Sequence, residues 1–170
     1  MAQRKLVVSD ITVGYDGLFD FAELFKMIDD WFYKNRYEKV EVRHIERVKE
    51  KGKFVDYEIM PRRKISDYAD YEIYVRVTVN NMTDATIKKG GKEMKLNKGN
   101  VTVTISAYLK TDVRHQWEAT PFRFFFRALF DKFVHKQYTD RYENEILKDV
   151  QEFHTELKSY LNLNRYVNPS

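Results

Sequence analysis

Strict alternation of apolar and polar residues between residues 38 and 110 is the feature that most limits how this chain folds. The alternation runs through four segments, and a glycine pair divides the last two. Their apolar residues are Val40, Val42 and Val48; Val55, Tyr57 and Ile59; Tyr71, Ile73, Val75, Val77 and Val79; and Val101, Val103, Ile105, Ala107 and Leu109. Because successive strand side chains point to opposite faces, each segment has one dry and one wet face, as in antiparallel sheets. Residues 4–15 predict one further strand, and Gly90-Gly91 predicts a two-residue hairpin turn.

An amphipathic helix is expected after this first strand. Asp20 and Glu23 form the capping-box pattern that marks a helix start. The apolar face that follows consists of Phe21, Leu24, Phe25, Met27, Ile28, Trp31 and Phe32. Such a face predicts a helix that packs on a sheet.

The C-terminal part of the chain predicts more helix. On a helix that includes the stretch PFRFFFRALFDKFVHK (residues 121–136), Phe122, Phe125, Phe126, Leu129, Phe130, Phe133 and Val134 fill one half. Phe124 lies on the polar half, in line with Ala128. Residues 140–163 carry a narrow apolar stripe of Tyr142, Ile146, Val150, Phe153 and Leu157. Together with Phe124 and Ala128, this stripe predicts a seam for another helix.

Two geometries use this seam. In one, the chain turns at Thr139-Asp140, where Asp140 and Glu143 repeat the capping-box pattern, and two helices fold back as a hairpin in a monomer. In the other, a single uninterrupted helix grips the sheet with its first half and offers the seam to a second chain as a dimer. The sequence leaves both alternatives open.

The predicted architecture is a single α+β domain over residues 1–170. Its order is one strand, a helix, four to six strands, and then a long helix or helical hairpin, with residues 138–163 as an extension used for packing or dimerisation. This layout resembles helix-grip and cystatin-like folds, in which a curved antiparallel sheet wraps a helix. The resemblance is one of topology, and it carries no functional residues over to this chain.

Composition excludes several chemistries. The chain has no cysteine among its 170 residues, which excludes disulfides, thiolate metal sites and a cysteine nucleophile. The net charge of +4 is mild and spread along the chain, unlike that of a dedicated nucleic-acid binder. Neither a signal peptide nor a membrane-spanning stretch is apparent, so we expect a cytoplasmic protein. No motif predicts a cofactor, a metal site or a catalytic residue.

The first functional hypothesis is a non-catalytic ligand-binding or interaction module. Helix-grip sheets commonly enclose apolar ligands between sheet and helix, so the resemblance implies a lipid-like ligand here. The aromatic and histidine residues expected to line such a pocket are Phe25, Trp31, His44, Tyr57 and Phe126.

Three alternatives remain open. The lysine-rich hairpin at residues 88–98, with Lys88, Lys89, Lys92, Lys95 and Lys98, suits an anionic membrane surface or nucleic-acid phosphates. His44 is in phase with the core-facing valines, and Glu46 follows on the same face, so a small enzyme could use them as an acid–base pair. Arginines and aromatics on the wet face of the sheet suit RNA, although the carboxylates among them indicate cross-strand ion pairs instead.

Overall fold

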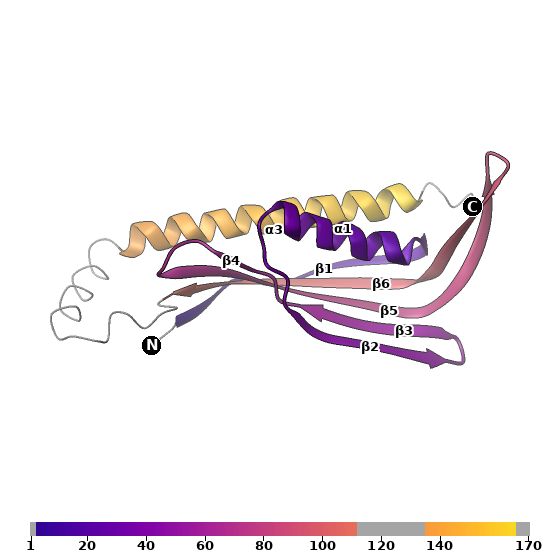
Figure 1. Cartoon of the computed structure of the whole chain (residues 1–170), viewed down its shortest axis with the longest axis horizontal. Coiled ribbons are helices and arrows are strands. Elements are labelled where there is room, and N and C mark those ends of the chain that lie inside the picture. The colour runs from indigo at the N-terminus through magenta and orange to yellow at the C-terminus, as the bar shows by residue number, and fades with distance from the viewer. Residues whose placement is uncertain (1–2, 112–134, 166–170) are drawn as a thin grey trace.

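Six antiparallel strands form one curved, open sheet in the computed structural model, which describes residues 3–111 and 135–165 (Figure 1). The strands are β1 (Gln3–Phe19), β2 (Glu41–Lys49), β3 (Gly52–Ile59), β4 (Arg62–Lys64), β5 (Ala69–Lys89) and β6 (Lys92–Thr111). Their spatial order is β1-β6-β5-β3-β2, and the short β4 pairs with β5. The helices α1 (Phe21–Lys34) and α3 (His135–Arg165) lie side by side on one face of the sheet. The predicted α+β class with an antiparallel sheet is confirmed.

The central strands β5 and β6 carry the core on their helix-covered face. Every predicted inward side chain of these two strands, from Tyr71 to Val79 and from Val101 to Leu109, is at most 1% exposed. They pair directly with one another, as in Val77 opposite Val103. The alternation predicted from the sequence is therefore correct for the strands that have neighbours on both sides.

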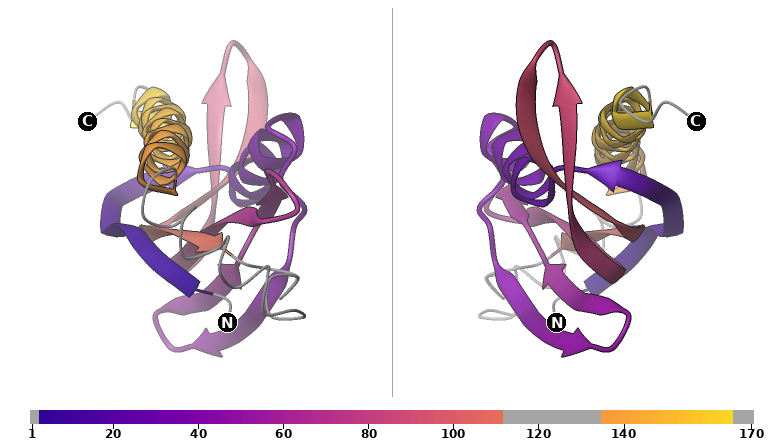
Figure 2. Two further views of the ribbon diagram at one scale, coloured as in Figure 1. Left: turned by 90° about the vertical axis from the view of Figure 1, so that its left-hand side faces the viewer. Right: turned by 90° about the vertical axis from the view of Figure 1, so that its right-hand side faces the viewer.

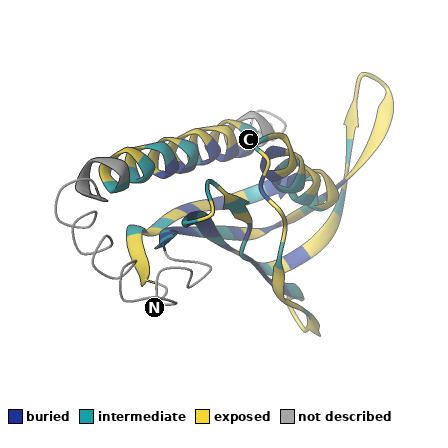
Figure 3. Ribbon diagram, turned by 60° about the vertical axis from the view of Figure 1, so that its left-hand side comes forward, coloured by how far each residue is buried: buried dark blue, intermediate teal, exposed yellow. Residues whose placement is uncertain are grey.

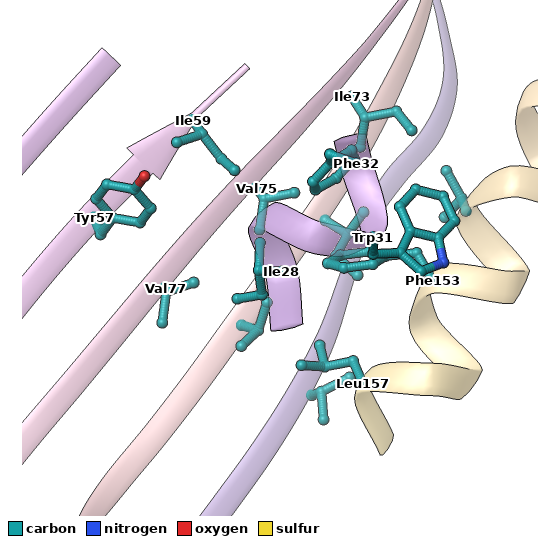
Figure 4. Close-up of a cluster of buried hydrophobic side chains, with 14 of the residues drawn as sticks. Ile28, Trp31, Phe32, Tyr57, Ile59, Ile73, Val75, Val77, Phe153 and Leu157 are labelled. Atoms are coloured by element: carbon teal, nitrogen blue, oxygen red, sulfur yellow. The ribbon is translucent and has the colours of Figure 1, made fainter. Parts of the chain in front are cut away.

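Helix α1 begins where the capping pattern predicts. The Asp20 side chain accepts a hydrogen bond from the backbone N–H of Glu23 at 2.9 Å. Leu24, Ile28 and Phe32 are buried members of the hydrophobic core. Figure 4 shows Ile28 and Phe32 beside Ile73 and Val75 of β5. Phe25 and Met27 are only partly buried at the edges of this face.

Helix α3 corrects the predicted break. It continues without interruption through Thr139 and Asp140, so the turn expected there is wrong. Glu143, the partner of Asp140 in the supposed capping box, instead forms an ion pair with Lys5 of β1. Ile146 and Phe153 are completely buried, like the rest of the stripe beyond Tyr142, against the chain's own sheet and α1. Phe124, Ala128 and the other residues of 121–134 lie outside the described part of the chain.

Strand β2 corrects a second expectation. It stands at the edge of the sheet, and none of its residues is buried. Val42 is 51% exposed and Val48 is 88% exposed, although both were predicted to face the core. The reason is that the helices cover the central strands and stop short of β2, as the exposure in Figure 3 shows.

A β-bulge changes the direction of the β5–β6 hairpin. The register shifts between Asn80 and Thr83, where β5 has one extra residue, and Asn81 takes a positive φ of 54°. Gly99 of β6 and Gly52 of β3 pack against this bulge. A Cβ at Gly99 would lie 3.0 Å from the carbonyl oxygen of Asn80, and one at Gly52 would lie 2.7 Å from a backbone carbon. Bulges bend and twist a strand, and here the hairpin leaves the plane of the sheet.

Candidate functional site

Beyond the bulge, the β5–β6 hairpin forms a projecting arm, which we define as residues 83–98. In Figure 2 its tip rises past the level of both helices. The strands stay paired to the last residue, with Lys89 opposite Lys92, and Gly90 and Gly91 form the turn with φ of 58° and 77°. The predicted two-residue turn is confirmed. The arm is thus an ordered ribbon whose two faces are set by its register.

The five predicted surface lysines all lie on this arm and are exposed. They are Lys88, Lys89, Lys92, Lys95 and Lys98. None of them forms an ion pair with another described residue, although Glu93 stands directly opposite Lys88. Five lysines against Asp84 and Glu93 leave the arm with an uncompensated positive charge.

The bulge also decides which way the apolar side chains of the arm point. Residues directly opposite each other share a face of the sheet, and β6 runs on through the bulge without a shift of its own. Ala85 pairs with Leu96, and Ile87 with Met94, on the face away from the helices. Lys89, Lys92 and Lys98 lie on that same face. Met94 is 42% exposed and Ile87 is partly buried, whereas Leu96 is buried at 8%, so the accessible apolar surface beside the three lysines consists mainly of Met94 and Ile87.

The base of the arm is fixed to the body of the protein. The side-chain oxygen of Asn97 accepts a hydrogen bond from the backbone N–H of Phe21 at 3.1 Å, at the first turn of α1. The side-chain amide of Asn97 donates to Asp84 across the hairpin at 3.3 Å. These bonds hold the arm at a defined angle to α1.

His44 and Glu46 are close enough to interact but lie on an open surface. Nε2 of His44 is 3.0 Å from Oε1 of Glu46, and their side chains are 41% and 37% exposed. A hydrogen bond from Lys53 is the main cause that lowers the pKa of Glu46, which makes this carboxylate a weaker base. The pair exists as the sequence suggests, but on an exposed edge strand instead of in a core.

The residues predicted for an apolar pocket occupy two separate places. The ring of Phe25 packs on Tyr57, with centroids 4.9 Å apart, and His44 packs on the same tyrosine at 5.2 Å. Trp31 instead turns toward α3 and contacts Phe153 at 4.9 Å. Phe126 lies outside the described residues. Three of the four described side chains therefore meet at Tyr57, and Trp31 packs elsewhere, against α3.

A polar cluster around the buried Tyr37 and Tyr71, which sequence reasoning missed, joins α3 to the sheet. The Tyr37 hydroxyl donates to Asp149 of α3 at 2.7 Å, and Arg63 of β4 forms an ion pair with the same carboxylate at 2.8 Å. Tyr71 donates to Glu145, one turn earlier on α3, at 2.9 Å. Burial raises the pKa of Tyr37 and of Tyr71, and the two carboxylates raise it further, so both hydroxyls keep their protons. The cluster fixes α3 on the sheet.

The outer face of the sheet is neutralised by cross-strand ion pairs. Asp56 is 4% exposed and accepts two hydrogen bonds from Arg76, at 2.9 and 3.0 Å, which lowers its pKa. Burial and a hydrogen bond to Glu58 raise the pKa of Tyr74 to about 12. Oε2 of Glu72 lies 2.9 Å from Nε of Arg4, and the other carboxylate oxygen of Glu72 forms ion pairs with Arg62 and Lys110. Glu58 lies 3.4 Å from Arg43 and 3.5 Å from Arg76. The predicted ion pairs are therefore confirmed for Asp56, Glu58 and Glu72, and they engage arginines that would otherwise be available to bind phosphate.

An open groove runs between α1 and α3. Its floor is formed by Trp31, and its rims carry both signs of charge, such as Lys34 and Lys148 against Glu152 and Glu156. Mixed rims of this kind do not select for one class of charged ligand. Of the two described helices, neither has an apolar stretch long enough to cross a bilayer.

The comparisons with known proteins add no assignment. No protein-family model matches the sequence, and no curated protein matches it either. On the arm, exposed charge of predominantly one sign that forms no ion pair with a described residue lies beside the exposed apolar side chain of Met94. The arm is therefore the strongest candidate site.

Proposed function

We propose that this protein is a non-catalytic module that attaches to anionic membrane surfaces through its arm. The observation that carries this proposal is the shared outer face of the arm, where Lys89, Lys92 and Lys98 flank the apolar strip with Ile87 and Met94. Lysines bind the phosphates of lipid headgroups, while neighbouring apolar side chains enter the boundary between headgroups and acyl chains.

Lipid is favoured over nucleic acid by the composition of the arm. Residues 83–98 contain no aromatic side chain on which a base could stack. Proteins that bind single strands combine positive charge with such stacking platforms. An apolar strip beside lysines contributes little on a nucleic-acid backbone, but it contributes directly at a lipid surface.

The test is co-sedimentation with vesicles that contain phosphatidylserine. Each lysine close to an anionic surface contributes about 1 kcal/mol. Changing Lys89, Lys92 and Lys98, the three lysines of the outer face, to glutamine is therefore expected to weaken binding by about two orders of magnitude. Vesicles of phosphatidylcholine alone should not bind the unaltered protein.

A matched control distinguishes the effect of the arm lysines on vesicle binding from a general effect of net charge. Lys26, Lys148 and Lys158 are exposed residues of the helices, and changing all three to glutamine removes the same charge elsewhere. This control should keep vesicle binding within a few-fold of the unaltered protein. Equal loss in both variants, or retardation of single-stranded RNA without vesicle binding, would show that the proposal is wrong.

A further inference from the structure

The outer edge of β2 is the other unusual surface of the molecule. Among the described strands β2 pairs only with β3, so the backbone groups on its other side have no strand partner. From Arg43 to Lys49 the pairing with β3 is regular, and no proline interrupts the strand. A regular, open edge of this length is a template for pairing with another strand.

The opposite edge of the sheet is built differently. The pairing of β1 with β6 shifts register twice, between Leu6 and Ile11, and Asp10 within this stretch has a positive φ of 41°. Helix α3 also packs along β1. Irregular and covered edges resist strand addition, so β1 is protected, whereas β2 has a single register shift, at Val42, and none of its residues is buried.

The sequence of β2, Glu-Val-Arg-His-Ile-Glu-Arg-Val-Lys, is complementary to its own reverse. If two copies pair antiparallel about a twofold axis at Ile45, Glu41 meets Lys49 of the second copy and His44 meets Glu46. On the axis, Ile45 meets its own counterpart. Opposite charges and apolar pairs directly across a ladder each stabilise it.

The two exposed valines fit the same register. Val42 meets Val48 of the second copy, so the side chains that are 51% and 88% exposed in one chain cover each other. One pair, Arg43 with Arg47, brings like charges together. Arg43 already lies 3.4 Å from Glu58 and 3.7 Å from Asp56, and these carboxylates offset its charge.

Neighbouring registers are less favourable. A shift of two residues in one direction places Arg43 opposite Lys49 and Glu46 opposite its own counterpart. A shift in the other direction places Val42 opposite Glu46. Register in a sheet is set by such side-chain matching, because a two-residue shift keeps the same face but changes every partner. Only the register centred on Ile45 pairs all nine residues of β2.

We propose that β2 is a self-association edge through which two copies of this chain join their sheets into one continuous antiparallel sheet. The partner is a second copy because the charge pattern of the edge fits its own reverse. An isologous contact of this kind closes after two copies and does not propagate into a fibre. The inference is independent of the membrane proposal, which concerns the arm.

The first test is the mass of the protein in solution as a function of concentration, by light scattering or sedimentation. The unaltered chain is expected to shift from monomer to dimer as concentration rises. Ile45→Lys places two ammonium groups opposite each other on the axis and should leave a monomer with an unchanged circular dichroism spectrum. A chain that stays monomeric at every concentration, or a variant that dimerises as well as the unaltered chain, would overturn the proposal.

The second test reads the register itself. The chain has no cysteine, so any disulfide that forms must involve the introduced cysteine. Opposite residues in a ladder have Cα atoms about 4.5–5.5 Å apart, within the range that a disulfide spans. Ile45→Cys is therefore expected to form a disulfide-linked dimer under mild oxidation.

The control variants are Arg43→Cys and Arg47→Cys. Each alone places its two cysteines about 13 Å apart, too far for a disulfide, whereas a mixture of the two variants brings position 43 opposite position 47. We expect no cross-link in either pure sample and a mixed cross-link in the mixture. Cross-linking of pure Arg43→Cys at the rate of Ile45→Cys would rule out this register.

Discussion

The same two strands, β5 and β6, form both the most buried part of the sheet and a projecting, largely exposed arm. Before the bulge at Asn81, their inward side chains are at most 1% exposed and hold the helices. Beyond it, in the arm, Met94 is 42% exposed and every lysine is accessible. One continuous ladder therefore carries stability in its body and an interaction surface in its arm. The difference arises from what covers the ladder, since the pairing itself is similar in both halves.

The largest effect on the body is expected from Phe153→Ala. This ring is completely buried between Trp31 and Phe32, with centroids 4.9 Å from each. Its removal leaves a cavity and should lower the free energy of unfolding by about 3–5 kcal/mol. Urea unfolding followed by circular dichroism measures this loss. A loss below about 1 kcal/mol would mean that α3 does not pack on α1 as described.

The next effect concerns the polar cluster that holds α3. Asp149→Ala leaves Tyr37 and Arg63 without their carboxylate, and we expect a loss of about 2 kcal/mol in the free energy of unfolding. Tyr37→Phe removes one hydroxyl alone and should cost about 1 kcal/mol. Equal losses in the two variants would show that the ion pair with Arg63 contributes nothing.

A smaller and pH-dependent effect is expected on the outer face. Arg76 lowers the pKa of Asp56 in the folded protein, so this carboxylate stabilises the fold at pH values above its unfolded pKa of 3.8. That stabilisation is lost as pH falls through the lower folded pKa. Asp56→Asn should cost about 1 kcal/mol near neutral pH, since Arg76 is 46% exposed, and almost nothing in strong acid. Unfolding curves of both proteins across this pH range give the difference in their free energies of unfolding. This difference should shrink as the pH falls, and a difference that grows toward acid would contradict the prediction.

The smallest effect on stability is expected in the arm. Met94→Ser changes an exposed side chain and should alter the free energy of unfolding by less than about 0.5 kcal/mol. If the apolar strip enters the lipid boundary, the same change should weaken vesicle binding by about fivefold, the equivalent of about 1 kcal/mol of apolar burial. Unchanged vesicle binding would restrict the proposed contact to the lysines.

The sequence predicts the body well because local pattern and tertiary environment agree there. The alternation from Tyr71 to Val79 and the Asp20 cap both reappear in the structure. The same alternation fails at β2, because a period of two distinguishes two faces but does not say whether a helix reaches them. The spacing of Asp140 and Glu143 is typical of a helix start, yet Glu143 forms an ion pair with Lys5 of β1. Because Lys5 is far away in the sequence, the local pattern does not predict this contact.

The candidate site was predictable in part. The glycine pair and the lysines predict an exposed hairpin, and both are found on the arm. The apolar strip with Ile87 and Met94 was missed, because its orientation depends on the bulge at Asn81. The single extra residue reverses the faces of β5 beyond it and so brings Ile87 to the face of Met94, and only the register with β6 reveals this change. The polar cluster around Asp149 likewise joins residues far apart in the sequence.

Shortening the arm tests the division of roles most directly. In this variant residues 85–96 are replaced by an Asn-Gly turn, so that Asn97 keeps its bonds to Phe21 and Asp84. Thermal unfolding and co-sedimentation with phosphatidylserine vesicles are measured on the same sample. We predict an almost unchanged unfolding temperature and no vesicle binding. A shortened protein that still binds these vesicles as the full chain does would contradict the role assigned to the arm.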